Sequence, residues 1–138
     1  MKVVFFNRKP RALGNFSVES YFKQMRENMP AEIEALSIDM PFESSGFFKR
    51  LANAIYCVFK QGDINHITGD IHYVGIFLNK KKTILTVLDC GMLHQTSGIK
   101  FKLLKWLWFD IPIARAARIT AISTATKEDI LRFIPRCP

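Results

Sequence analysis

The stretch Asp63-Ile-Asn-His-Ile-Thr-Gly-Asp-Ile-His-Tyr73, together with Lys82-Thr-Ile-Leu-Thr-Val-Leu-Asp-Cys-Gly91, decides the fold of this chain. In each stretch a short apolar run typical of a buried strand, residues 64–68 and 84–88, ends directly in small, polar or ionisable residues. In an open α/β sheet, ligands bind at the carboxyl ends of the strands. Polar residues gathered there indicate a binding site rather than an ordinary surface.

Three further segments have the pattern of strands. Val3–Phe6 is wholly apolar, as in a central parallel strand, whereas Ile33–Ile38 alternates apolar and polar residues and predicts a strand nearer the sheet edge. Ile119–Ile122 is the last strand. Because helical patterns separate these strands, we predict an α/β fold: a Rossmann-like parallel sheet with helices on both faces, in one domain over residues 1–138.

The helical patterns fill the intervals between these strands. Gly62 is expected to cap the second helix, and Asp110-Ile111-Pro112 is expected to break or restart the fourth. A loop is expected over residues 89–98, and a solvated basic turn at residues 80–82. The predicted helices cover residues 17–29, 48–59, 71–78, 100–109 and 127–133.

Length and composition limit the class of protein. At 138 residues, 49% apolar and 12% aromatic, the chain is long enough for one domain with a real core. Cys57, Cys90 and Cys137 have no metal-type spacing, which indicates free thiols in a reducing, cytoplasmic compartment. No apolar run reaches the ~18 residues that span a bilayer, and the start does not have the pattern of a signal peptide. The net charge of +8 requires an acidic partner, an anionic membrane surface or a missing acidic neighbour.

Asp89, Asp70 and His72 are the candidate residues of the site. Asp89 directly ends a strand, where it either orients ligand hydroxyls or caps backbone amides in the loop. Asp70 follows Gly69, and its alternative role is the N-cap of the helix that begins at residue 71. His72 lies one turn into that helix, where it still faces the cleft.

His66 lies inside a strand between apolar neighbours, so a hydrogen-bonded core position is the alternative to a binding role. Together with Asp70 and His72 it raises the question of a zinc or iron site. The Gly69 turn separates His66 from the other two residues, and no fourth ligand is evident. We therefore expect no metal site.

Gly14 is a further candidate residue, and several known catalytic motifs are absent from the sequence. Gly14 lies in a loop leading into a helix, where backbone N–H groups approach an anion or a sugar hydroxyl, but a glycine that only eases a turn is the alternative. No Gly-x-Gly-x-x-Gly fingerprint accompanies it. Cys90 has no basic partner in sequence, and Ser17 lacks the Gly-x-Ser-x-Gly context of a hydrolase nucleophile.

The helix at residues 100–109 mixes lysines with tryptophans. That composition suits the headgroup layer of an anionic membrane, and the alternative is a core-facing helix whose lysines stay solvated. The basic residues of the chain follow no nucleic-acid-binding motif, so no nucleic acid partner is expected. The membrane-facing candidates are Lys100, Lys102, Lys105, Trp106 and Trp108.

Taken together, these segments resemble the N-terminal domain of the family 4 glycosyltransferases of the GT-B fold. The resemblance covers nearly the whole chain, and it depends on the order and spacing of motifs that are individually weak. The motifs are Gly14-Asn-Phe-Ser-Val-Glu19, residues 63–73, Leu85-Thr-Val-Leu-Asp89 and Thr120-Ala-Ile-Ser-Thr-Ala-Thr-Lys127.

The resemblance implies a retaining enzyme that transfers a sugar from a nucleotide-sugar donor, with no other cofactor. Two Rossmann-like domains then face each other across a cleft. The N-terminal domain holds a glycan or lipid-linked acceptor, and a C-terminal domain absent from these residues holds the donor, so this chain alone is expected to be inactive. Asp89 becomes the catalytic candidate. The substrate-binding candidates are Gly14, Asn15, His66, Gly69, Asp70, His72 and Ser123.

One position departs from the family pattern. Leu88 stands where many members carry a histidine that contacts the donor sugar, and His72 and His94 are candidates to replace it. Two other classes of function stay open. One is a non-catalytic basic α/β domain that binds an anionic partner or a membrane surface, at the inner face of the membrane, and the other is a flavodoxin-like binder of small molecules.

Overall fold

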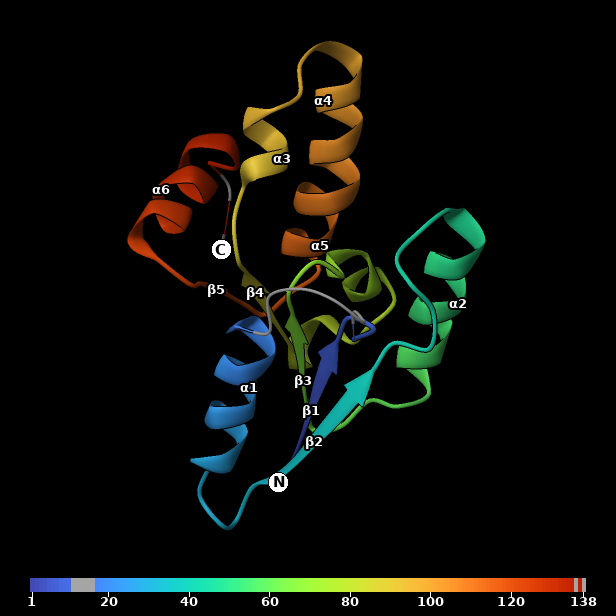
Figure 1. Cartoon of the computed structure of the whole chain (residues 1–138), viewed down its shortest axis with the longest axis vertical. Helices are drawn as coiled ribbons and strands as arrows, with labels where there is room; N and C mark the ends of the chain where they lie inside the picture. Colours follow the sequence, from blue (N-terminus) through green and yellow to red (C-terminus); the bar gives the residue numbers. More distant parts are fainter. Residues whose placement is uncertain (11–16, 136, 138) are drawn as a thin grey trace.

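The chain folds around a five-stranded sheet in which all neighbouring strands are parallel. The computed structural model describes residues 1–10, 17–135 and 137. The strands lie in the order β2-β1-β3-β4-β5 (Figure 1). Their bounds are β1 Lys2–Asn7, β2 Glu34–Asp39, β3 Ile64–Thr68, β4 Thr83–Val87 and β5 Arg118–Ala121. The predicted α/β class is therefore confirmed, with residues 33–38 at the sheet edge.

The helices between these strands include short 3₁₀ turns and one π-helical turn. The α-helices are α1 Ser17–Glu27, α2 Phe47–Val58, α3 Gly91–His94, α4 Gly98–Lys105, α5 Ile111–Ala114 and α6 Thr124–Phe133. The 3₁₀ turns are η1 His72–Ile76 and η2 Lys80–Lys82, and the π-helical turn is η3 Trp106–Asp110.

Helices cover both faces of the sheet, as predicted, because the side chains of each strand alternate between the faces. Val3 and Phe5 of β1 point to the face of α1, where they pack with Phe22. Val4 and Phe6 point to the opposite face, into the larger core that α2, α5 and α6 also enter. Burial on both faces explains the unbroken apolar run of this strand.

The strand order reverses at β1, which pairs with β2 on one side and β3 on the other. In α/β sheets, the crevice at such a switch point opens outside the carboxyl ends of the strands. The carboxyl ends of β1, β3 and β4 therefore border the place where a ligand is expected.

The predicted helix over residues 71–78 is present but shorter, as the single 3₁₀ helix η1 over His72–Ile76. It packs directly on β3: a Cβ added to Gly75 would lie 2.9 Å from Cδ1 of Ile67. A short segment in such close contact with the sheet closes as one tight turn rather than a full α-helix.

The segment from residue 89 to 114 is more helical than the sequence predicts. The expected loop contains α3, and the next helix continues from α4 through the π-helical turn into α5. Pro112 does not end this helix, and it lies in the first turn of α5 directly after the π-helical turn. Within the described part of the chain, no helix has the length and apolar character needed to cross a bilayer.

Gly62 does not cap α2, since the helix ends at a C-cap formed by Phe59. A Cβ at Gly62 would lie 2.8 Å from the carbonyl oxygen of Lys2 and 3.0 Å from Cγ2 of Val4. The glycine is needed there for the close approach of two backbone segments.

Candidate functional site

A cavity of about 340 Å³ lies beside the carboxyl ends of β3 and β4. Asp70, His72 and Asp89 all line it, so the structure brings together three of the residues that the sequence placed in one cleft. The lining is completed by Ser44, Met92, Trp108 and Phe109. Carboxylates, an imidazole and aromatic rings thus meet in one hollow, drawn from segments far apart in sequence.

The two carboxylates are exposed at the ends of their strands. Gly69 has φ +78°, which turns the chain sharply after β3 and presents Asp70. Asp89 accepts a 2.8 Å hydrogen bond through Oδ1 from the backbone N–H of Gly91. Asp89 therefore caps a backbone amide in the loop, and it also lines the cavity. The N-cap alternative for Asp70 is wrong, since η1 has Ile71 at its N-cap and no side-chain cap.

His72 is buried against the cavity wall, where it stays neutral. Desolvation by burial lowers its pKa, against the opposing effects of the Trp108 hydrogen bond and of the Asp70 and Asp89 carboxylates. Nδ1 lies 3.0 Å from the backbone carbonyl of Trp108, and because a carbonyl only accepts, Nδ1 carries the proton. Nε2 is then left as a hydrogen-bond acceptor.

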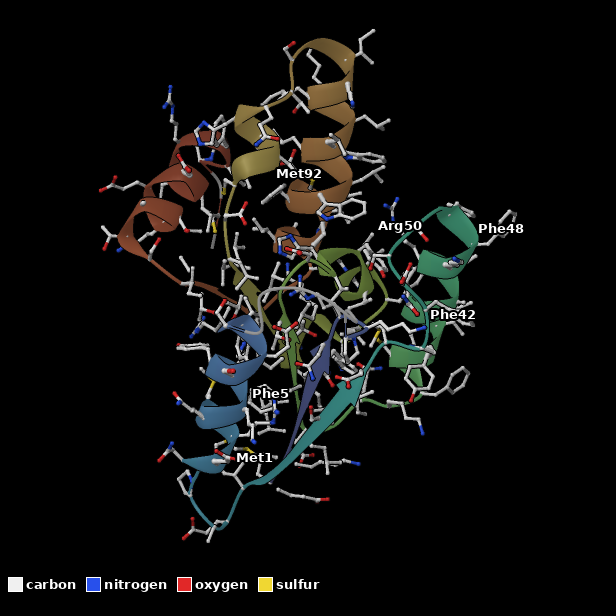
Figure 2. The ribbon with its side chains drawn as sticks, in the orientation of Figure 1. Met1, Phe5, Phe42, Phe48, Arg50 and Met92 are labelled. Carbon is white, nitrogen blue, oxygen red and sulfur yellow. The ribbon has the colours of Figure 1, made fainter. Side chains whose placement is uncertain are left out.

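Trp108 forms the aromatic wall of the cavity. Its ring packs against Tyr73 with the centroids 5.6 Å apart, and the guanidinium of Arg50 lies 4.5 Å from its centroid. Arg50 projects from the upper part of α2, while Met92 lies on α3 (Figure 2). The cation–π contact thus joins α2 to the segment around Trp108.

A hydrogen-bond chain holds the α2 side of the cavity. The hydroxyl of Tyr73 lies 2.9 Å from Oγ of Ser44 and accepts a 3.1 Å hydrogen bond from Nδ2 of Asn53. Arg50 donates through Nε to the carbonyl of Ser44 at 3.0 Å. Because Asn53 also bonds both backbone groups of Phe42, the loop after β2 is anchored to a buried side chain. The wall is therefore preorganised.

A second hollow of about 330 Å³ shares Ser44 and Asp70 with the cavity and extends it toward β1. Arg8, which directly follows β1, lines this hollow and pairs with Glu19 at 2.9 Å and with Asp70 at 3.4 Å. The site consequently has a cationic side at the switch point and an acidic, aromatic side at β3 and β4.

Other predicted site residues lie elsewhere. His66 is in the core under α1, 5.0 Å from the ring of Phe5 between centroids, and its Nε2 lies 2.7 Å from Oγ1 of Thr86. Burial lowers its pKa to about 4, so it is a neutral, hydrogen-bonded core histidine rather than a cleft residue. Gly69 shapes the turn before Asp70. Gly14 and Asn15 lie outside the described residues.

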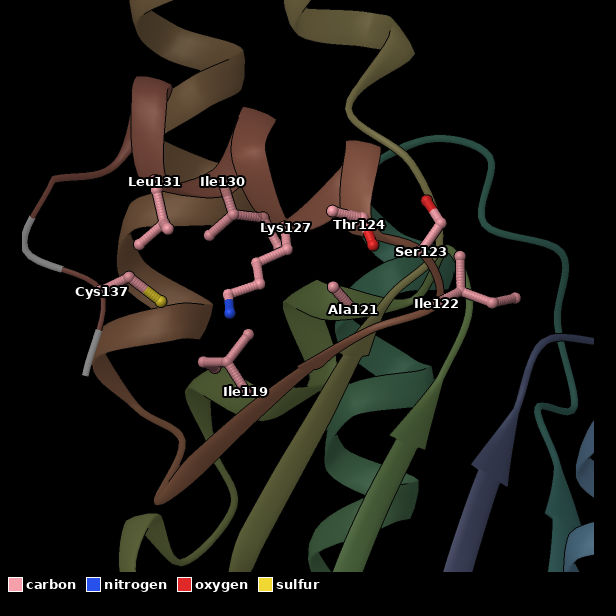
Figure 3. Close-up of a pocket in the computed structure, with 9 residues that line it drawn as sticks. All are labelled: Ile119, Ala121, Ile122, Ser123, Thr124, Lys127, Ile130, Leu131 and Cys137. Carbon is pink, nitrogen blue, oxygen red and sulfur yellow. The ribbon is translucent and has the colours of Figure 1, made fainter.

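Ser123 lines a different hollow of about 490 Å³ between β5 and α6 (Figure 3). Its Oγ accepts the backbone N–H of Thr126 at 3.1 Å and so caps α6. The hollow is lined mainly by apolar side chains, including Ile119, Ile130 and Leu131. Ser123 is therefore a capping residue that lies apart from the cavity at β3 and β4.

Leu88, the position at which the sequence departs from the resembled pattern, directly follows β4. Leu88 packs with the cluster on the α1 face, whereas His72 shares the cavity with Asp89. His94 instead pairs with Asp129 at 2.8 Å on the α6 side. Of the two candidate replacements, only His72 lines the cavity.

Cys90 lies just beyond β4 and is buried. Burial, with Asp129 and Asp89 nearby, raises the pKa of Cys90 to about 11. The thiol therefore stays protonated at neutral pH and is a poor nucleophile. In the described part of the chain, no three acidic, histidine or cysteine side chains are grouped so as to hold a metal ion.

Sequence reasoning missed Arg8, Ser44 and Arg50, and it assigned Trp108 to a membrane surface. A signal was available for Arg8, because it follows a strand end as Asp70 and Asp89 do. Ser44 and Arg50 reach the site through the loop after β2 and through α2. Their positions depend on packing that the local sequence pattern does not encode.

Comparison of this chain with protein-family models, with curated proteins and with solved structures finds no match. Its class is therefore defined by the fold and the site alone: a parallel α/β domain with an acidic and aromatic cavity at the carboxyl edge of its sheet.

Proposed function

We propose that this chain is the acceptor-binding half of a retaining glycosyltransferase. In this proposal it holds a glycan or lipid-linked acceptor, and a second Rossmann-like domain holds the nucleotide sugar. The observation that carries the proposal is the shared lining of one cavity by Asp70, His72, Asp89 and Trp108.

The chemistry of these groups suits a sugar. Carboxylates and a neutral imidazole nitrogen accept hydrogen bonds from hydroxyl groups, and charged acceptors form the stronger bonds. An indole face offers a flat apolar surface to the C–H groups of a pyranose ring. A half-buried cavity with a few polar groups against aromatic walls has the composition expected of a small-ligand site.

Each residue then has a distinct role in the proposal. Asp89, at the tip of β4, orients the reacting hydroxyl of the acceptor, and Asp70 and Nε2 of His72 fix its neighbouring hydroxyls. Arg8 at the switch point supplies positive charge beside the departing phosphate of the donor. Holding the acceptor hydroxyl in line with the donor sugar is the main contribution open to an acceptor domain.

The test is acceptor binding by the 138-residue chain, screened on a glycan array and measured by calorimetry. Asp89→Asn preserves shape and the bond to Gly91 but removes the charge, and Trp108→Ala removes the stacking surface. Loss of a hydrogen bond to a charged group is worth about 1.5–3 kcal/mol, so affinity for the bound glycan should fall about tenfold or more in Asp89→Asn.

Matched controls separate the cavity from the general surface. Asp129→Asn changes a carboxylate paired with His94, and Trp106→Ala removes the exposed tryptophan two residues from Trp108. Neither should alter glycan affinity. Absence of any bound glycan, or equal losses in the controls and the cavity variants, would refute the proposal.

The second candidate function is a basic, non-catalytic domain that binds an anionic surface. The observation that favours it is separate from the cavity: several large apolar side chains of α2 and α4 are exposed to solvent.

A further inference from the structure

Helix α4 is apolar on a face that the rest of the protein does not cover. Ile99, Leu103 and Trp106 are 86%, 54% and 53% exposed, at the helical spacing i, i+4, i+7. The core-facing alternative holds for part of the segment over residues 100–109, because Phe101, Trp108 and Phe109 pack in or against the core. Within α4 itself no residue is fully buried. The apolar residues of this face are not explained by the folding of the domain.

Lysines flank this face. Lys100 and Lys102 are exposed, and neither forms a salt bridge within the described residues. Lys102 lines a shallow apolar hollow together with Ile99 and Trp106. The sequence had also assigned Lys105 and Trp108 to this surface. Lys105 is instead bound to Asp110 at 2.7 Å, and Trp108 lines the cavity.

A second exposed apolar cluster lies at the start of α2. Phe47 and Phe48 are 71% and 83% exposed, and their rings form an edge-to-face pair with centroids 5.6 Å apart. Exposed Lys49 follows them directly. Phe48 points away from the body of the protein (Figure 2).

Both clusters are at the same end of the molecule. The beginnings of α2 and α4 project beyond the carboxyl ends of the strands, and the N-terminus of the chain lies at the other end (Figure 1). The cavity with Asp70 and Asp89 lies beside the carboxyl ends of β3 and β4 and is lined by Trp108, which Arg50 of α2 contacts.

We infer that the starts of α2 and α4 together form a docking surface for an anionic phospholipid bilayer. Isoleucine, leucine, tryptophan and phenylalanine side chains enter the boundary between headgroups and acyl chains, and Lys49, Lys100 and Lys102 remain at the level of the anionic headgroups. The net charge of +8 attracts the protein to such a surface at long range. This inference does not require that the cavity binds sugar.

The test is sedimentation of the chain with vesicles. Vesicles of phosphatidylcholine mixed with phosphatidylglycerol should retain the protein, and vesicles of phosphatidylcholine alone should retain far less. Raised salt should weaken binding, because screening removes the contribution of the lysines.

Four variants identify the surface. Phe48→Ser and Ile99→Ser shorten the apolar contact, and the double variant Lys100→Glu/Lys102→Glu reverses its charge. The double charge reversal should weaken partitioning about tenfold or more, since each basic residue near the surface contributes about 1 kcal/mol. The fourth variant, Trp108→Phe, leaves Trp106 as the only tryptophan of the chain. Its fluorescence emission should shift to shorter wavelength when anionic vesicles are added.

Controls come from the other end of α2 and from the turn η2 that precedes β4. Phe59 is 81% exposed just after the other end of α2, and Lys80 and Lys82 are exposed before β4. Phe59→Ser and Lys80→Glu/Lys82→Glu should leave partitioning close to wild type.

Failure to bind anionic vesicles, or equal losses in controls and variants, would overturn the inference. The inference would also be overturned if the chain did not bind vesicles but formed a dimer in analytical ultracentrifugation that Phe48→Ser abolished. Glycan binding by Phe48→Ser, Ile99→Ser and Lys100→Glu/Lys102→Glu should be unchanged, which keeps this outcome separate from that of the proposed function.

Discussion

His66 and His72 are both buried, yet they belong to regions with opposite organisation. His66 lies on the α1 face between the rings of Phe5 and Phe22, with its polar atom bonded within the sheet. His72 lies just beyond the end of β3, with Asp70, Asp89 and an indole around the same cavity. Two histidines six positions apart thus differ because one side chain fills a core and the other borders a hollow. The α1 face should therefore determine stability, and the cavity should determine binding.

The largest effect on stability is expected from Phe22→Ala. Phe22 is 1% exposed and contacts both Phe5 and His66, so the change leaves a cavity under the single helix on that face. The free energy of unfolding should fall by about 3–5 kcal/mol, measured by urea denaturation. Phe48→Ala, at an 83% exposed position, should change it by less than about 0.5 kcal/mol. Similar losses in both variants would contradict the assignment of the α1 core.

The next effect is a dependence of stability on pH caused by His66. Burial lowers its pKa from 6.5 to about 4, so between these values the unfolded chain binds more protons than the folded one. Stability from this group is complete above pH 6.5 and is lost as pH falls toward 4, by about 3 kcal/mol. Burial lowers the pKa of His72 as well, and this adds a loss in the same direction.

Comparison of wild type with His66→Gln in chemical denaturation at several pH values isolates this contribution. The variant should lose less stability between pH 6.5 and 4, because glutamine keeps a polar partner for Thr86 but does not titrate. Parallel pH profiles for the two proteins would show that His66 is not the buried group proposed.

Gly69→Ala tests the junction between the two regions. At φ +78° an L side chain is strained, and the added Cβ would lie 3.4 Å from Cδ1 of Leu88. The free energy of unfolding should fall by about 1–2 kcal/mol in thermal or urea unfolding. Gly98→Ala is the matched control, since it has φ +64° and open space around the Cβ. Both variants should lose stability, but only Gly69→Ala displaces Asp70 and should weaken glycan binding.

Asp89→Asn should have the smallest effect on stability, within about 0.5 kcal/mol, because the side chain is exposed and asparagine still accepts the bond from Gly91. Its effect should appear in glycan affinity instead. A thermal shift as large as that of Gly69→Ala would show that Asp89 holds the loop together rather than serving the cavity.

The strands were predictable because their signals are local. β3 was predicted with its observed bounds, and β1 and β4 differ from their predicted ends by a residue at each end. Apolar runs of this kind indicate strands that are buried on both faces of a sheet. The polar residues that follow them indicate which residues lie at the carboxyl edge of the sheet. Asp70 and Asp89 were found from this signal alone.

The errors came where tertiary contact overrides local pattern. Residues 71–78 are apolar enough for a longer helix, but they form only a short 3₁₀ helix, in which Gly75 lies close against Ile67 of β3. Trp106 and Trp108 share a sequence context, yet the π-helical turn directs Trp108 toward Tyr73 and Arg50 while Trp106 remains exposed. His66 and His72 likewise needed the fold to be told apart.

The sequence by itself determined the parallel α/β sheet and the presence of acidic residues at its carboxyl edge, because periodicity and strand-end chemistry are properties of consecutive residues. Only the tertiary structure decided which side chains share the cavity, since Ser44, His72 and Trp108 reach it from three separate connections between strands. The same holds for the uncovered starts of α2 and α4. Exposure is a property of what packs against a residue, and packing partners are set by the whole chain.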